Sequence, residues 1–200
     1  MPIAINGSAG TITGYTPTAV NGQLALSNMP SGSVLKTFNQ TLTVGETISV
    51  ANNTSTGNSI TFADSSFDLT CNLVRSDSNL LILADMKYSA TINAVYRIYD
   101  VTNSQIVLGS VDPTHVNQQA LSSGPVGGSG PNGGNQFATP TTPCMVYYNP
   151  PANNSTIRFK IQFTGANDSG TVYLSRAVSD TNYLYDSNGP SSLTILEIAA

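Results

Sequence analysis

The side chains of this 200-residue sequence that could supply nucleophilic or metal chemistry are one histidine, His115, and two cysteines, Cys71 and Cys144. A Ser-His-Asp triad would have to use His115, and no serine context typical of an activated nucleophile accompanies it. Zinc sites need several histidine or cysteine ligands, and the cysteines lack the CxxC spacing of metal or redox motifs. We therefore expect a loop histidine and two small half-buried cysteines, and leave open whether the cysteines are bridged.

Eleven acidic side chains raise the question of glycan cleavage. Glycosidases hold two carboxyl groups roughly 5 to 9.5 Å apart across the scissile bond. Here most acids lie in turn sequences, as Asp77, Asp168 and Asp186 do, where aspartate bonds its own backbone. The EF-hand pattern is missing, while a looser oxygen site in the Asn- and Asp-rich loops stays open. We expect no enzymatic activity, no metal site and no cofactor.

A glycine-rich segment, residues 122–136 (SSGPVGGSGPNGGNQ), is the other motif with a chemical interpretation. Loops that hold phosphate groups follow GxxxxGK[ST] or GxGxxG and lead into a helix. This segment has no lysine and no helical pattern after it. We interpret it as an exposed connection in which glycine permits free bending.

The charge content excludes two classes of partner. Only 9% of residues are charged, against a usual ~25%, and the net charge is −4. Nucleic acid binding needs clustered Lys and Arg, and anionic membranes attract the same clusters. The seven basic residues are scattered, so we expect neither partner. We also expect no signal peptide and no membrane insertion.

The elements that must position these residues are strands. Ile157, Phe159, Ile161 and Phe163 alternate with polar side chains, which predicts one buried and one wet face. Residues 80–84 are apolar throughout and predict a central strand covered on both faces. Further strands are expected at 33–42, 46–51, 60–62, 67–74, 93–101, 105–108, 170–176 and 191–199. Eight to ten such strands with regular turns indicate an all-β antiparallel sandwich or barrel.

Residues 1–32 differ from the body at 33–200, because turn signals interrupt every short apolar piece and no side chain is charged. We interpret them as an extended arm held by a partner surface, with a loose terminus as the alternative. The arm residues expected to anchor it are Ile3, Ile5, Ile12, Tyr15, Leu24 and Leu26.

Two further groups of residues are predicted to lie at contacts between molecules. The last strand is apolar on both faces yet contains Glu197, whose burial without a partner would be costly. We hypothesise that Glu197 pairs with Arg176 or another arginine, within or between subunits. The predicted subunit interface comprises Leu193, Ile195, Leu196, Glu197, Ile198 and Arg176. Tyrosines suit interfaces and sugar stacking, and Tyr147, Tyr148, Tyr183 and Tyr185 form a candidate surface for a receptor or partner.

Several segments together resemble small virion proteins of tailed bacteriophages. Residues 145–162 (MVYYNPPANNSTIRFKIQ) are similar to their "(F/Y)xDxPxTxSxxTYKVQ" pattern, and residues 170–176 (GTVYLSR) followed by 179–181 (SDT) to "GTxYVNRxxxDT". Residues 191–200 (SSLTILEIAA) resemble "STLTLMEIAA", and the segments 2–8 and 29–36 resemble the opening of the same proteins. Asn149 departs from the pattern, which more often has an acid there. The resemblance implies a jelly-roll module, usually trimeric, on a capsid or tail fibre.

These observations lead to two main functional expectations. The first is a homotrimeric capsid decoration (cement) protein, located in the virion, whose arm docks on the major capsid protein or other virion proteins. The second is a receptor-binding tail-fibre head that recognises a host surface glycan or protein. A secreted lectin-like domain is a third expectation.

Overall fold

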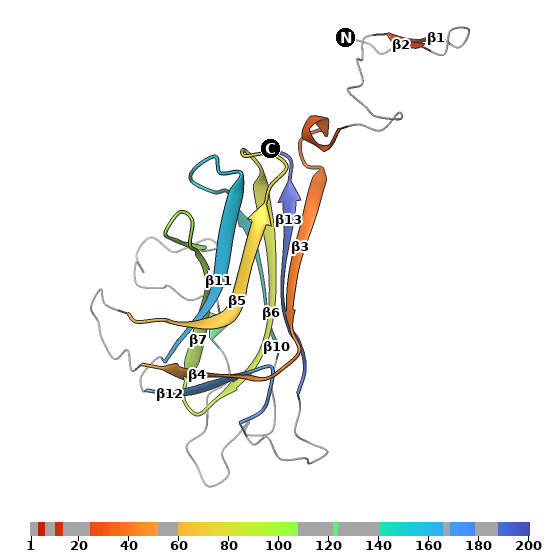
Figure 1. Cartoon of the computed structure of the whole chain (residues 1–200). Coiled ribbons are helices and arrows are strands. Elements are labelled where there is room, and N and C mark those ends of the chain that lie inside the picture. Colours follow the sequence, from red (N-terminus) through yellow and green to blue (C-terminus); the bar gives the residue numbers. More distant parts are fainter. Residues whose placement is uncertain are drawn as a thin grey trace.

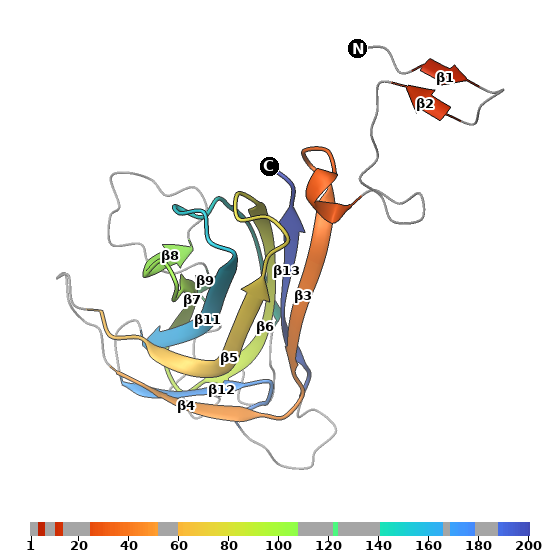
Figure 2. The same cartoon turned by 45° about the horizontal axis from the view of Figure 1, so that its top comes forward.

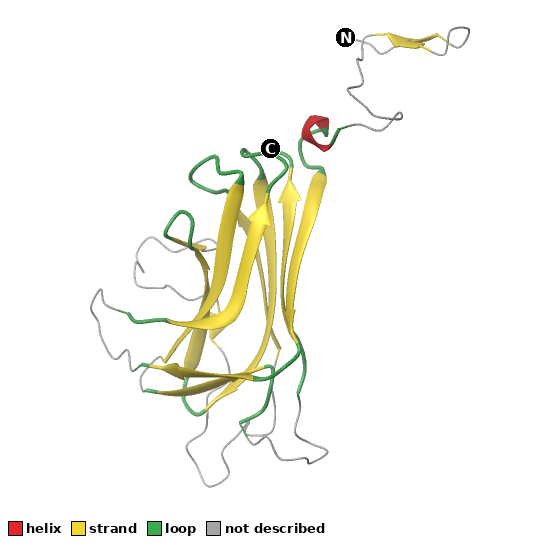
Figure 3. Cartoon of the chain, viewed as in Figure 1, coloured by secondary structure: helices red, strands yellow, loops and turns green. Residues whose placement is uncertain are grey.

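The computed structural model describes residues 4–6, 11–13, 25–51, 60–107, 122–123, 141–165, 169–178 and 188–200. Strands dominate these residues, as Figure 3 shows, and the remaining element is a single turn of 3₁₀ helix, η2 (Leu26–Asn28). The strands are β1 (Ala4–Asn6), β2 (Thr11–Thr13), β3 (Val34–Leu42), β4 (Glu46–Val50), β5 (Ala63–Asn72), β6 (Asn79–Ala90), β7 (Ala94–Asp100), β8 (Gln105–Val107), β9 (Ser122–Ser123), β10 (Thr141–Tyr148), β11 (Thr156–Gly165), β12 (Gly170–Leu174) and β13 (Ser191–Ile198).

Two antiparallel sheets pack face to face as a β-sandwich (Figure 1). The first sheet contains β3, β13, β6 and β10, in that order, and the second contains β5, β11, β7 and β8. Taken in chain order, the first of these eight strands is matched with the last, the second with the seventh, the third with the sixth and the fourth with the fifth. This nesting is a long hairpin rolled up on itself, which is the jelly-roll arrangement. The predicted all-β jelly-roll-like sandwich is confirmed.

The strands β4 and β12 extend the first sheet across one end of the sandwich (Figure 2). Strand β6 is long enough to pair with β13 and β10 along most of its length and with β12 at residues 88–90. A group of side-chain and backbone hydrogen bonds fixes this junction. Ser191 Oγ accepts a hydrogen bond from the backbone N–H of Lys87 at 3.0 Å, and the backbone N–H of Ser175 donates to Lys87 O at 2.6 Å. The backbone of β6 is therefore held in place where it passes from one set of neighbours to the other.

The core lies between the sheets and follows the period-two pattern. Ile157, Phe159, Ile161 and Phe163 are completely buried, as the alternation predicts. Phe163 packs edge-on against Tyr88 with ring centroids 5.2 Å apart, the geometry that aromatic pairs prefer. Each such side chain contributes roughly 1.5–3 kcal/mol of burial free energy, so the sandwich is held mainly by these inward rows.

Polar side chains close the gap between β5 and the first sheet. Strand β5 pairs with β11 on one side, and side chains reach the backbone groups of its other edge. Gln40 accepts from Asp68 N at 2.9 Å, Glu46 accepts from Ser66 N at 3.0 Å, and Lys36 donates to Asn72 O at 2.9 Å. An unpaired strand edge is a template for aggregation, and these contacts occupy it.

The strands differ from the predictions in three places. Residues 60–62 are not a strand, because the ladder with β11 begins at Ala63. Residues 141–148 form β10, which was not expected because Pro143 breaks the apolar pattern. Residues 80–84 are central as predicted, yet one of their faces is only half-buried in this chain. The remaining predicted strands are present with small differences at their ends.

Candidate interaction surface

Within the described residues, the side chains with potential for nucleophilic or metal chemistry are not assembled into a site. Cys71 and Cys144 are both free thiols, on β5 and β10. Asp77 forms an ion pair with Arg75, two residues away, at 2.8 Å. Among the described residues no three His, Cys, Asp or Glu side chains gather as a metal site would require. His115, Asp168 and Asp186 lie outside the described residues.

Burial makes Cys71 unreactive and makes the stability of the fold decrease at alkaline pH. Burial raises the pKa of the Cys71 thiol to about 12, and burial with a hydrogen bond to Asp100 raises the pKa of the Tyr148 phenol. Both groups are neutral in the folded protein and lose protons more easily once unfolded. Their contribution to stability is therefore complete below pH about 9 and is lost as the pH rises towards the folded-state values.

We expect the free energy of unfolding, measured in urea, to fall between pH 9 and pH 12. The variant Cys71→Ala should have lower stability at pH 7, because it leaves a small cavity, but a shallower fall with pH. An unchanged slope in Cys71→Ala would contradict this assignment. Thiol titration of the folded protein at pH 8 provides a second measurement, in which Cys71 should not react until the protein unfolds.

The outer face of the second sheet is charged and hydrated. Arg158 pairs with Asp68 and Lys160 pairs with Asp64, across the β5–β11 ladder. Arg97 on β7 continues the row, donating to the side chain of Gln162 at 2.8 Å and lying over the ring of Phe62. Such exposed pairs stabilise a fold by less than about 1 kcal/mol each. Their main effect is that this surface is hydrated and favours contact with solvent.

The outer face of the first sheet has the opposite character. Leu81 and Leu83 of β6, Met145 and Tyr147 of β10, and Leu196 of β13 point away from the core, because they alternate with the buried rows. We call these five residues the apolar face. Met145 and Tyr147 are 71% and 60% exposed, among the most exposed large hydrophobic side chains described. The outward residues of β3 beside it, Thr37, Asn39 and Thr41, are neutral and exposed.

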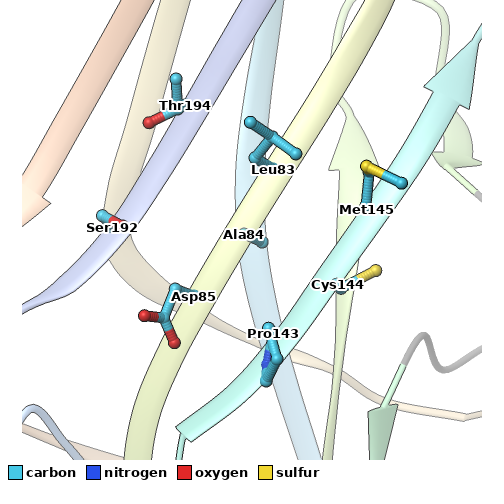
Figure 4. Close-up of a pocket in the computed structure, with 8 residues that line it drawn as sticks. All are labelled: Leu83, Ala84, Asp85, Pro143, Cys144, Met145, Ser192 and Thr194. Carbon is cyan, nitrogen blue, oxygen red and sulfur yellow. The ribbon is translucent and has the colours of Figure 1, made fainter.

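A hollow of about 430 Å³ lies around Leu83, Asp85 and Met145 (Figure 4). This is the end of the apolar face nearest the β6 residues that pair with β12. One side of it is hydrophilic, with Ser192 and Thr194 of β13. The other side is apolar, with Pro143 and Met145 of β10. Between them β6 contributes Leu83, Ala84 and Asp85, and Cys144 completes the lining. The hollow therefore has the amphipathic walls of a site for a group with an apolar stem and a polar end.

Asp85 and Lys87 are the charged residues of β6, at successive outward positions. Asp85 Oδ1 is buried without a hydrogen-bond partner, although buried polar atoms are almost always bonded. Lys87 is partly buried, its stem lies beside Gly189, and its backbone is fixed at the β12 junction. Both side chains are thus placed on the outer surface without a partner inside the described part of the chain.

The predicted interface residues divide between the core and this surface. Leu193 and Ile195 are completely buried inside the sandwich, so the prediction that they contact another subunit was wrong. Both faces of this strand are apolar in sequence, and alternation alone does not say which one points inward. Leu196 and Ile198 are on the outward side and half-buried, so their place in a subunit contact stays a prediction.

The hypothesis that Glu197 pairs with an arginine was also wrong. Its carboxylate is completely buried and accepts hydrogen bonds from Val74 N at 2.8 Å, Arg75 N at 2.9 Å and Ser78 Oγ at 2.8 Å. Arg176 lies at the opposite end of β13, next to Ser175, which bonds Ser191. Backbone donors of the turn after β5, rather than a side-chain cation, satisfy the acid.

The structure describes some of the predicted tyrosines and arm residues, while the anchoring role of the arm stays a prediction. Tyr147 is exposed, but Tyr148 is buried and donates its hydroxyl hydrogen to Asp100 at 2.8 Å, so Tyr148 contributes no outer surface. In the arm, Ile5 of β1 pairs with Ile12 of β2, and Leu26 of η2 is 50% exposed. The remaining predicted residues, Tyr183, Tyr185, Ile3, Tyr15 and Leu24, lie outside the described residues.

No protein-family model and no curated protein matches this sequence. Within the described residues no helix has the length and hydrophobicity needed to span a bilayer.

Proposed function

We propose that this chain is a non-enzymatic structural protein of a bacteriophage particle, which assembles as a homotrimer and decorates the capsid through its N-terminal arm. The observation that carries the proposal is the contrast between the two outer faces of the sandwich. One carries a ladder of ion pairs, and the other presents Met145 and Tyr147 to solvent. Jelly rolls occur in viral capsid proteins among others, but a fold alone does not fix a function.

The outer face of the first sheet, which contains the apolar face and the neutral border on β3, has the size of a subunit contact. Four strands about 4.8 Å apart, each with about eight residues rising roughly 3.3 Å, give a projected area of about 500 Å². Side-chain relief enlarges the accessible area towards the roughly 800 Å² per partner found in stable interfaces. Monomers rarely leave an apolar patch of more than a few hundred Å² in water. A protein partner that covers this face is therefore expected.

The charge pattern favours a second copy as that partner. In symmetric assemblies a surface meets the same or an adjacent surface of an identical chain, so a face with charge of one sign would repel itself. The apolar face is neutral, and the neighbouring Asp85 and Lys87 cancel. Neutral hydroxyl and amide groups such as Thr37 and Asn39 at its border also lose less free energy on desolvation than charges do.

The arm has the features of a segment that is completed by another protein. Its strands β1 and β2 have three residues each, paired from Ala4–Thr13 to Asn6–Thr11. An isolated two-stranded hairpin is only marginally stable in water, and the first 35 residues contain no charge. A neutral groove between capsid subunits would supply the missing packing. The resemblance to phage virion proteins supports the same placement.

Deleting residues 2–24 tests the decoration proposal. The deletion keeps η2 and the hydrogen bond from Gly32 N to Ala199 O at 2.8 Å, so the sandwich should fold with unchanged circular dichroism and oligomer mass. Binding to capsids that lack the protein, measured by co-sedimentation, should fall at least about 10-fold. The full chain serves as the control. Equal binding of both chains would refute a role for the arm.

The alternative is a receptor-binding fibre head, which the exposed Tyr147 favours, because tyrosine provides rigid contact area for glycans and proteins. Purified protein would then block adsorption of the phage to its host, and Tyr147→Ala would relieve the block. Decoration predicts no effect on adsorption and density for the chain on the shell.

A further inference from the structure

Two charged side chains of β6 have no partner among the described residues, whereas the other described charges do. The described cations Lys36, Arg75, Arg97, Arg158, Lys160 and Arg176 each have a contact within the chain, as do the carboxylates of Glu46, Asp64, Asp68, Asp77, Asp100 and Glu197. Asp85 and Lys87 are the exceptions among these described residues, and they do not pair with each other. Two unlike charges without partners, side by side at a neutral face, point to a complement outside the chain.

We propose that Asp85 of one copy pairs with Lys87 of a neighbouring copy, an inference that rests on the self-association proposed above. The two residues are two positions apart on the same face of β6. Because Asp85 and Lys87 lie side by side on this face, Asp85 of each copy can meet Lys87 of the next copy around a three-fold axis.

The hollow beside Asp85 fits a lysine side chain of the neighbouring copy. Lysine buries its methylene stem on apolar surface and keeps its ammonium group near polar partners. Here Leu83, Pro143 and Met145 would contact the stem. The carboxylate of Asp85 would receive the ammonium, which donates three hydrogen bonds, and the hydroxyl oxygens of Ser192 and Thr194 lie in the same hollow.

The hollow in a single chain lacks a hydrogen-bond donor for Asp85. Asp85 Oδ1 is shielded from water without a donor, a situation that costs free energy in a folded protein. A charge-assisted hydrogen bond is about twice as strong as a neutral one, so an ammonium group is the most favourable complement. Lys87 is available for this role because the structure assigns its ammonium group no partner in the described residues.

Charge reversal tests the pair directly. Asp85→Lys and Lys87→Asp, made singly, should each raise the subunit dissociation constant at least about 30-fold, measured by analytical ultracentrifugation. The double exchange Asp85→Lys/Lys87→Asp should return it to within about 5-fold of the natural chain. Asp68→Lys is the matched control, because it changes the net charge by the same amount as Asp85→Lys but on the charged outer face of the second sheet. It should leave association unaltered. Circular dichroism verifies that each variant is folded.

Cross-linking of the natural chain gives a readout that needs no variant. A carbodiimide joins a carboxylate to an amine only where the two are in contact. In a mixture of ¹⁴N- and ¹⁵N-labelled copies, mass spectrometry should find Asp85–Lys87 peptides that contain one partner of each label. If the chain forms an oligomer without these peptides, or if the double exchange fails to restore association, the Asp85–Lys87 pair is refuted while self-association stands. A natural chain that is monomeric at all concentrations overturns the self-association as well.

Discussion

Replacing Glu197 with alanine is expected to lower the free energy of unfolding by about 3–5 kcal/mol, because three donors inside the protein lose their acceptor at once. The carboxylate is completely buried and holds the backbone N–H groups of Val74 and Arg75 together with the hydroxyl of Ser78. Water cannot replace it without opening the turn between β5 and β6. Urea unfolding at pH 7 measures the difference, and the melting temperature should fall by roughly 6–20 °C.

Glu46→Ala is the matched control for this prediction. Glu46 also binds a backbone N–H and a hydroxyl, both of Ser66, but it is only partly buried. Water can reach the donors it leaves behind, so a loss of about 1 kcal/mol is expected. Glu197→Gln keeps one acceptor oxygen and should fall between the two variants. Equal losses for Glu46→Ala and Glu197→Ala would contradict the argument that burial decides the cost.

The sequence predicts the sandwich well because alternation is a local property. Ile157 to Phe163 have one arrangement that buries the apolar row and keeps Arg158 and Lys160 in water, and the structure has that arrangement. The same reasoning fails for β13. Leu193 and Ile195 on one side and Leu196 and Ile198 on the other are equally apolar, and only the packing of the second sheet determines which pair is inside.

Contacts between distant segments could not be predicted from the sequence. Glu197 meets the turn at 74–78, about 120 positions earlier, and an acid in an apolar strand indicates only that some partner exists. The pairing of β10 with β6 likewise places Met145 next to Leu83 and Pro143 next to Asp85. Without that register neither the apolar face nor the hollow can be recognised, although period two along β6 and β10 marks each outward residue separately.

Tyr147→Glu is expected to weaken self-association by at least about 100-fold while leaving the isolated sandwich almost unchanged. The side chain is 60% exposed in the single chain, so a carboxylate there remains hydrated before assembly. In an assembled pair of apolar faces it would lose its water without gaining a cation, at a cost of about 3 kcal/mol or more. Sedimentation velocity across a concentration series measures the change, and urea unfolding confirms that the fold is retained.

Thr70→Glu separates this effect from a general increase in negative charge. Thr70 is exposed on β5 and faces Arg158 in the charged outer surface, where a new carboxylate stays in water. The two variants carry the same net charge, so long-range repulsion between copies is nearly the same in both. If the apolar face is the contact, Tyr147→Glu dissociates the oligomer and Thr70→Glu does not. Dissociation by Thr70→Glu alone would place the contact on the second sheet, where ion pairs rather than apolar side chains would have to hold the copies together.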